Sequence, residues 1–218
     1  MKTFKLHLLR HGLTEANRKG IYAGSGTDLP LSDEGVAQLD RLREDFEYPQ
    51  VDLVLVSPLL RARQTADILF PGVRQIGIED LREIGFGEFE GKTVAQLQND
   101  PAYRDWLNPE RRLTPPGGES GDAFARRAGE VLRKICEFLI RSGTPEAAVV
   151  THGGLLMTAL AIHAIPRRPP EQWACDPGCG FTVQTDAASL MRDASVEALE
   201  IIPYGYGEYC AARAAERR

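Results

Sequence analysis

The feature that most constrains the fold is the alternation of short apolar runs with amphipathic stretches. Runs rich in Val, Leu and Ile recur along the 218 residues, and helical patterns separate them. This alternation is typical of βαβ units around a mostly parallel sheet, so we expect an α/β fold. The expected strands span residues 4–9, 52–56, 73–78, 147–151, 180–185 and 196–202.

Amphipathic stretches predict four helices between these strands, at residues 33–46, 58–70, 121–141 and 154–164. The third is the longest, and its apolar residues from Phe124 to Leu139 fall on one face. Ser32 is expected to cap the first helix, because its hydroxyl can accept from free backbone N–H groups. Pro58 is expected at the first position of the second helix, where its missing N–H has no cost.

Residues 84–120 interrupt the alternation with many glycines and prolines. A long, punctuated excursion inside one domain is typical of a lid or a binding loop. We therefore expect a single domain over 1–218 with a lid or loop inserted around 84–120. The Tyr-rich segment from Tyr204 leads into a terminal helix, which either covers a dimer contact or packs on its own sheet.

Composition excludes several functional classes. The net charge of −5 argues against nucleic acid and anionic membranes as partners. No run is long enough to span a bilayer, and residues 1–12 do not resemble a signal peptide. Four cysteines are few for a secreted scaffold, so we expect a cytoplasmic protein. Cys175 and Cys179 lack a second ligand pair, so we expect no metal site.

Residues that can do chemistry follow four of the expected strands. These residues are Arg10, His11, Ser57, Arg61, Glu83 and His152. Because the carboxyl ends of parallel strands meet at one edge of a sheet, we expect these side chains to converge. Two imidazoles, two guanidinium groups and a carboxylate suit phosphoryl transfer, in which positioning and electrostatics do most of the work without a cofactor.

Each of these residues also has a structural interpretation. A single histidine at a strand end is more often a hydrogen-bonding residue than a catalyst. We also expect structural roles for His7, on a strand, and for His163, within or just after a helix. Arg61 could pair with an acid on its own helix, and several acidic neighbours compete with Glu83. The coincidence of all the groups at separate strand ends favours the functional interpretation of the set.

The spacing of these residues resembles a known family. The matching motifs are Leu9-Arg10-His11-Gly12-x-Thr14-x-x-Asn17, Ser57-x-x-x-Arg61-x-x-Gln64-Thr65-Ala66 and Thr151-His152-Gly153. Together they resemble the histidine phosphatase superfamily, in its phosphoglycerate mutase-like branch, over most of the chain. The resemblance implies a three-layer α/β/α sandwich.

The resemblance also implies a role for each residue of the site. His11 would be the nucleophile that becomes phosphorylated. The phosphate would be held by Arg10, Asn17, Arg61, His152 and Gly153. Glu83 would protonate the leaving group and then activate water, as microscopic reversibility requires.

Within the family, the sequence resembles phosphatases more than mutases. Ile84 follows Glu83, where the mutases carry a basic residue, and segments 86–91 and 116–120 resemble phosphatase members. The layout is similar to that of the alpha-ribazole phosphatases. Candidate residues for the mouth of the site are Trp106, Arg111, Arg112 and Glu119.

The leading hypothesis is a metal-independent phosphomonoesterase acting on a small phosphorylated metabolite, with alpha-ribazole 5'-phosphate as the candidate substrate. One alternative is phosphoglycerate mutase activity. An alternative of another class is a non-catalytic protein that binds a phosphorylated ligand. The partner in every case is a small phosphate monoester, and a homodimer is a further expectation.

Overall fold

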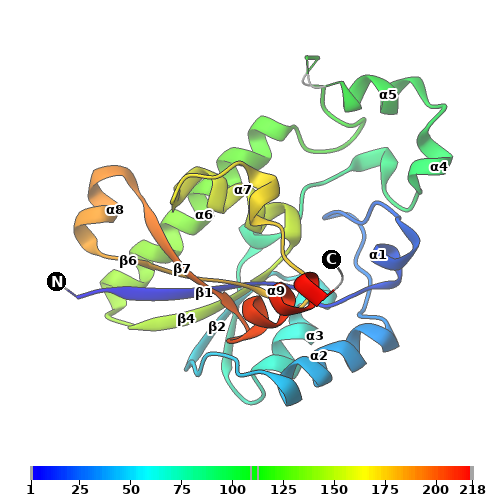
Figure 1. The fold of residues 1–218 in the computed structure, drawn as a ribbon. Coiled ribbons are helices and arrows are strands. Elements are labelled where there is room, and N and C mark those ends of the chain that lie inside the picture. Colours follow the sequence, from blue (N-terminus) through cyan, green and yellow to red (C-terminus); the bar gives the residue numbers. More distant parts are fainter. Residues whose placement is uncertain (1, 109, 112, 217–218) are drawn as a thin grey trace.

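A seven-stranded sheet forms the centre of the computed structural model, which describes residues 2–108, 110–111 and 113–216 (Figure 1). The strand order is β3-β2-β4-β1-β6-β7-β5. Only β6 runs antiparallel to its neighbours β1 and β7, so the expected mostly parallel sheet is confirmed. The strands are β1 (Phe4–Arg10), β2 (Leu53–Val56), β3 (Arg74–Gly77), β4 (Glu146–Thr151), β5 (Ala164–Ile165), β6 (Gly180–Thr185) and β7 (Val196–Ile202).

Helices cover both faces of this sheet and complete a three-layer α/β/α sandwich, as expected. Figure 1 shows α6 and α7 on one face, with α2, α3 and α9 on the other. The helices are α1 (Glu15–Lys19), α2 (Asp33–Asp45), α3 (Leu60–Leu69), α4 (Val94–Leu97), α5 (Pro101–Leu107), α6 (Gly121–Ser142), α7 (Gly153–His163), α8 (Ala187–Asp193) and α9 (Tyr206–Glu216). Short 3-10 turns lie at η1 (Glu79–Leu81), η2 (Gly87–Phe89) and η3 (Pro170–Trp173).

The core has two halves because the central strands are buried on both faces. Leu6 and Leu8 of β1 pack with the apolar stripe of α6, whereas Leu9 packs with Leu39 on the opposite face. Continuous burial along a strand is typical of a parallel sheet covered by helices. Each fully buried leucine contributes about 1.5–3 kcal/mol to stability, so both layers of helices are firmly held.

Local details differ from the sequence expectations in three places. The Ser32 cap is confirmed, since its hydroxyl accepts from the Gly35 N–H at 3.1 Å. The placement of Pro58 at the first position of a helix is wrong. Leu59 is still extended, with φ −68° and ψ 137°, and α3 begins only at Leu60. Strand β5 and helix α8 were not expected, because two and seven residues are too few to show a period.

The 84–120 segment has its own small core. Phe89, Leu97 and Tyr103 are buried there, and the partly buried rings of Tyr22 and Trp106 pack against them. The Tyr22 and Tyr103 hydroxyls are 2.9 Å apart, which joins the segment to the chain that follows α1. In Figure 1, α4 and α5 stand beside α1, away from the sheet. A lid function of this segment stays a prediction.

The C-terminal helix α9 packs on its own sheet. Phe46 contacts the rings of Tyr206 and Tyr209, with centroids 5.4 and 5.5 Å apart.

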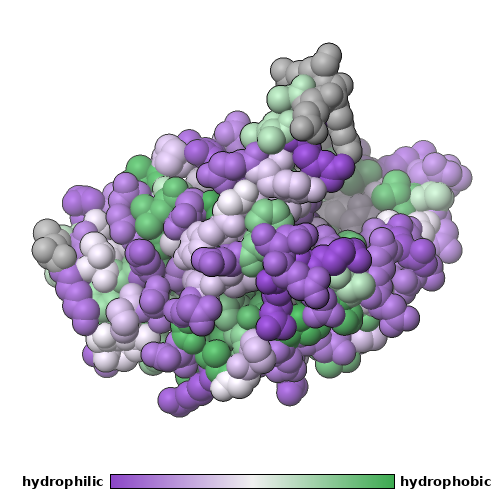
Figure 2. Space-filling view, turned by 60° about the horizontal axis from the view of Figure 1, so that its bottom comes forward, coloured by the Kyte–Doolittle hydropathy of each residue, from purple (hydrophilic) through white to green (hydrophobic). Residues whose placement is uncertain are grey.

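Within the described residues, no helix has the length and apolarity needed to cross a membrane. On the face seen in Figure 2, hydrophilic residues surround small, separate hydrophobic patches.

A close approach at Gly35 gives a test of the packing. A Cβ atom there would lie 2.2 Å from the Leu13 carbonyl oxygen. Gly35→Ala should therefore destabilise the fold by roughly 1–3 kcal/mol through overpacking. Gly121→Ala, where a Cβ meets nothing within 4 Å, should instead be neutral or stabilising. Urea unfolding measures both, and equal effects would contradict the close approach.

Candidate active site

The carboxyl ends of β1, β2 and β4 lie side by side and deliver the candidate residues to one edge. Arg10 is paired with Thr151, and Val56 with Val150. The residues that follow these strands therefore meet. The rings of His11 and His152 have centroids 5.1 Å apart in an edge-to-face arrangement. The predicted convergence is present in the structure.

His11 is held as a neutral imidazole with one nitrogen available. Its side chain is 5% exposed, and Nδ1 lies 2.7 Å from the Gly12 carbonyl oxygen. A carbonyl can only accept, so Nδ1 carries the proton and Nε2 keeps its lone pair. Burial, and then the charges of Arg61 and Arg10, lower the pKa of His11 to about 3. Nε2 therefore carries no proton over the physiological pH range.

Arg61 is a buried cation that approaches this nucleophile. Its side chain is 1% exposed, and Nε donates to His11 Nε2 at 3.3 Å. Nη1 donates to the Thr27 carbonyl at 2.9 Å, and Nη2 to that of Gly24 at 3.2 Å. Within the described part of the chain, these partners are two carbonyls and an imidazole, none of them an anion. The guanidinium charge therefore remains available to an anionic ligand.

His152 is oriented by a serine. Ser57 Oγ lies 2.7 Å from His152 Nε2, and both residues are fully buried. Burial, and then His11 and Arg61, hold the pKa of His152 well below its ordinary value, so this imidazole is neutral too. Its Nδ1 is buried with no hydrogen-bond partner among the described residues. Buried polar atoms are normally paired, so this nitrogen is a candidate contact for a ligand.

Arg10 and the glycines after His152 share another part of the site. Arg10 Nη1 donates to the Cys175 carbonyl at 2.9 Å. Its Nε is buried and unpaired within the described residues. A Cβ at Gly153 would lie 3.3 Å from this Nε, so glycine leaves the guanidinium its room.

Glu83 is held by two backbone N–H groups. Its carboxylate accepts from the Ile84 N–H and from the Gly154 N–H, each at 3.0 Å. A Cβ at Gly154 would stand only 2.5 Å from Glu83 Oε1, so this contact needs glycine. Burial raises the pKa of Glu83 above its ordinary value. A carboxyl group with a raised pKa can carry a proton to a leaving group.

Asn17 is placed differently from the other predicted residues. It is exposed, and its Oδ1 accepts from the Thr14 N–H at 3.1 Å and from the Thr14 hydroxyl at 2.9 Å. The first of these bonds and the bond from the Asn17 N–H to Thr14 Oγ1, at 3.3 Å, form the capping box at the start of α1. Its contact with phosphate stays a prediction.

The candidate mouth residues have structural partners of their own. Trp106 belongs to the aromatic cluster of the 84–120 segment, and Arg111 forms an ion pair with Asp105. Arg112 lies outside the described residues. Glu119 forms a bidentate ion pair with Arg127. Arg127 was missed by sequence reasoning, because nothing in the pattern separates it from other polar residues of α6.

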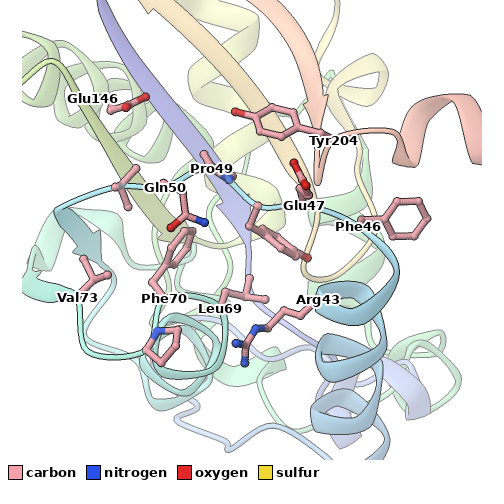
Figure 3. A pocket seen from close by; sticks show the side chains of 13 residues that line it. Arg43, Phe46, Glu47, Pro49, Gln50, Leu69, Phe70, Val73, Glu146 and Tyr204 are labelled. Carbon is pink, nitrogen blue, oxygen red and sulfur yellow. The ribbon is translucent and has the colours of Figure 1, made fainter.

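A cleft of about 790 Å³ lies near the end of β4 that is opposite to the candidate active site (Figure 3). Its lining includes Gln50, Phe70, Glu146 and Tyr204. Glu146 begins β4, whereas His152 follows its other end, so this cleft is remote from the two imidazoles. The candidate active site is therefore identified by its chemistry and not by the size of a hollow.

Two neutral imidazoles, two guanidinium groups and a carboxyl with a raised pKa are groups that suit an enzyme of phosphoryl transfer. Residues 6–188 match the model of the histidine phosphatase superfamily (branch 1). The chain belongs to this superfamily and is a phosphatase.

Similar proteins agree with this membership. The adenosylcobalamin/alpha-ribazole phosphatase of Salmonella typhimurium is 33% identical over 161 residues, which are 72% of this chain and 78% of that protein. The crystal structure of the alpha-ribazole phosphatase from Shigella flexneri superposes with a TM-score of 0.76 at 27% identity, covering 92% and 96% of the two chains. A phosphoglycerate mutase from Thermus thermophilus gives a TM-score of 0.62 at 33% identity, covering 91% and 98%.

The buried His11 predicts a loss of stability in acid. Its pKa of about 3 in the fold lies below the ordinary value of 6.5, so the unfolded chain binds the proton more tightly. Between pH 7 and pH 5 this residue alone should cost about 2 kcal/mol. His11→Asn, which does not titrate, should lose correspondingly less stability over that interval. Urea unfolding at both pH values tests this, and parallel losses would contradict it.

Proposed function

We propose that this phosphatase hydrolyses a small phosphate monoester through a phosphohistidine on His11. The observation that carries the proposal is the state of His11 Nε2. Nε2 carries no proton because Nδ1 donates to the Gly12 carbonyl, and its lone pair accepts a hydrogen bond from the buried Arg61 Nε at 3.3 Å, which a phosphate would have to displace. A nucleophile and an anion-binding cation therefore act at the same point.

In the first step, Arg10, Arg61 and His152 hold the phosphate oxygens. His11 Nε2 forms a bond to phosphorus while the bond from phosphorus to the leaving oxygen breaks. The leaving oxygen takes the proton of Glu83, so an alcohol departs and a carboxylate remains. Gly153 supports this arrangement by leaving space beside Arg10.

In the second step, a water molecule replaces the alcohol. The Glu83 carboxylate takes one proton from the water, whose oxygen attacks phosphorus as the bond to His11 Nε2 breaks. Inorganic phosphate leaves, and both residues return to their starting states. The N–H groups of Ile84 and Gly154, which donate to the Glu83 carboxylate, stabilise its charged form between the steps.

His11→Ala should abolish turnover of p-nitrophenyl phosphate, because the covalent step has no other acceptor. In the wild-type protein, rapid quenching should trap a phosphoryl group that is labile in acid and stable in base, and mass spectrometry should place it on His11. EDTA should leave the rate unchanged, since no step uses a metal ion. Near-normal activity of His11→Ala would contradict the mechanism.

We further propose alpha-ribazole 5'-phosphate as the substrate. Two of the similar proteins described above are alpha-ribazole phosphatases. The structural match to the Shigella flexneri protein covers 96% of that protein's chain. Ile84 also stands directly after Glu83, where the mutases carry a basic residue. Among sugar phosphates, nucleotides, phosphoglycerates and alpha-ribazole 5'-phosphate, the last should give the highest kcat/KM. A higher value for any other compound would overturn this substrate.

A second candidate activity is phosphoglycerate mutase, which the similarity to the Thermus thermophilus mutase favours. With 3-phosphoglycerate and a bisphosphate primer, the two activities give different products. A mutase isomerises the substrate with little release of phosphate. We expect phosphate release to dominate here.

We also infer a cytoplasmic location and a homodimer from the sequence. Fractionation of cells and light scattering of the purified protein test these two expectations. Neither is needed for the mechanism, because its six named residues all come from one chain.

A further inference from the structure

Arg127, a largely buried residue of α6, binds the chain that leads up to Glu83. Its Nη1 donates to the carbonyls of Asp80 at 2.9 Å and Arg82 at 2.7 Å. Its Nη2 donates to the carbonyl of Glu83 itself at 3.3 Å. Three carbonyls from four consecutive residues therefore converge on one guanidinium.

The same guanidinium is fixed from the other side by Glu119. Arg127 Nε and Nη2 donate to its two carboxylate oxygens at 3.0 and 2.6 Å, and both side chains are largely buried, with 17% and 23% exposed. The Glu119 N–H in turn donates to the Gly85 carbonyl at 2.8 Å. The chain is thus held just before Glu83 and just after it. Bidentate pairing also fixes the orientation of the guanidinium plane.

We propose that Arg127 is the positioning residue for Glu83, with Glu119 as its partner. Their contacts fix the backbone so that the Glu83 carboxyl lies against the N–H groups of Ile84 and Gly154. Arg127 acts on Glu83 through this geometry, and its charge is paired with Glu119. The inference rests on the proposed function, in which Glu83 is the proton donor.

Misplacement of Glu83 should matter most for substrates that need its proton. A donor must lie within hydrogen-bond reach of the leaving oxygen, and a shift of about 1 Å can cost roughly 100-fold in rate. The leaving oxygen of an alkyl phosphate must receive a proton in order to depart as an alcohol. The p-nitrophenolate group, by contrast, leaves readily as an anion. A general loss of folded protein would lower both rates equally.

The test compares Arg127→Lys with Arg133→Lys. Arg133 lies on the same helix and pairs with Glu137 at the surface, so its variant is the matched control. Arg127→Lys should lower kcat/KM for ribose 5-phosphate roughly 10- to 100-fold and that for p-nitrophenyl phosphate only a few-fold. Glu119→Gln should act in the same direction with a smaller effect. Equal losses on both substrates would overturn the proposal.

A double-mutant cycle separates this role from a direct one. In the Glu83→Gln background the proton donor is already gone, so Arg127→Lys should cause little further loss of kcat/KM for ribose 5-phosphate. Independent effects that multiply would mean that Arg127 does not act through Glu83.

A measurement without turnover tests the same contact. Carbon-13 NMR of the Glu83 carboxyl reports its pKa, which burial raises in the wild-type protein. In Arg127→Lys the carboxyl should move away from the Ile84 and Gly154 N–H groups, which favour its charged form, so the pKa should rise further, and Arg133→Lys should leave it unchanged. An unshifted pKa in Arg127→Lys would overturn the positioning role.

The two proposals fail in different ways. A wild-type protein that never phosphorylates His11, but whose Glu83 titration responds to Arg127→Lys, retains the positioning contact without the proposed function. A wild-type protein that forms phosphohistidine, but in which Arg127→Lys changes neither the leaving-group dependence nor the titration, retains the function without the positioning role.

Discussion

The burial of the Arg61 guanidinium is the interaction on which the rest of the site depends. A cation that is 1% exposed loses most of its hydration, and that loss costs several kcal/mol unless its donors are satisfied. Arg61 satisfies them with the carbonyls of Gly24 and Thr27 and with His11. These carbonyl dipoles compensate for the lost hydration, but they do not cancel the positive charge of Arg61. The charge therefore depresses the pKa of His11 and remains able to bind phosphate.

This arrangement requires the 24–27 loop to be held in place. Glu90 does so, since its Oε1 accepts from the Gly26 and Phe86 N–H groups, each at 3.1 Å, and its Oε2 accepts from the Thr27 hydroxyl. A Cβ at Gly24 would lie 2.2 Å from the Ile84 carbonyl oxygen, so only glycine permits this contact. The loop that solvates Arg61 is thus attached to the segment that follows Glu83. Arg61 and Glu83 therefore share one support.

The sequence predicted the parts of this site that lie at strand ends. His11, Arg61 and His152 follow runs whose apolar pattern is unambiguous, and parallel strands then require the residues to meet. The pattern could not predict the role of Arg127, because a partly buried arginine on an amphipathic helix looks like a solvated one. It also missed the start of α3, since the extended Leu59 depends on tertiary contacts. Pairings between distant carbonyls and side chains leave no period in a sequence.

The histidines of the site and the 84–120 segment pack against different cores. His11, Arg61 and His152 are 5% exposed or less and lie against the main core, so their geometry changes only if the fold changes. The 84–120 segment has a separate core around Phe89 and Tyr103, and it contacts the rest through Tyr22, Glu90 and Glu119. Because Glu90 also holds the 24–27 loop behind Arg61, a substitution in that small core that moves Glu90 would change the surroundings of His11. Arg127 lies where the two parts meet, so a change of substrate must preserve its contacts if Glu83 is to remain within reach of the leaving oxygen.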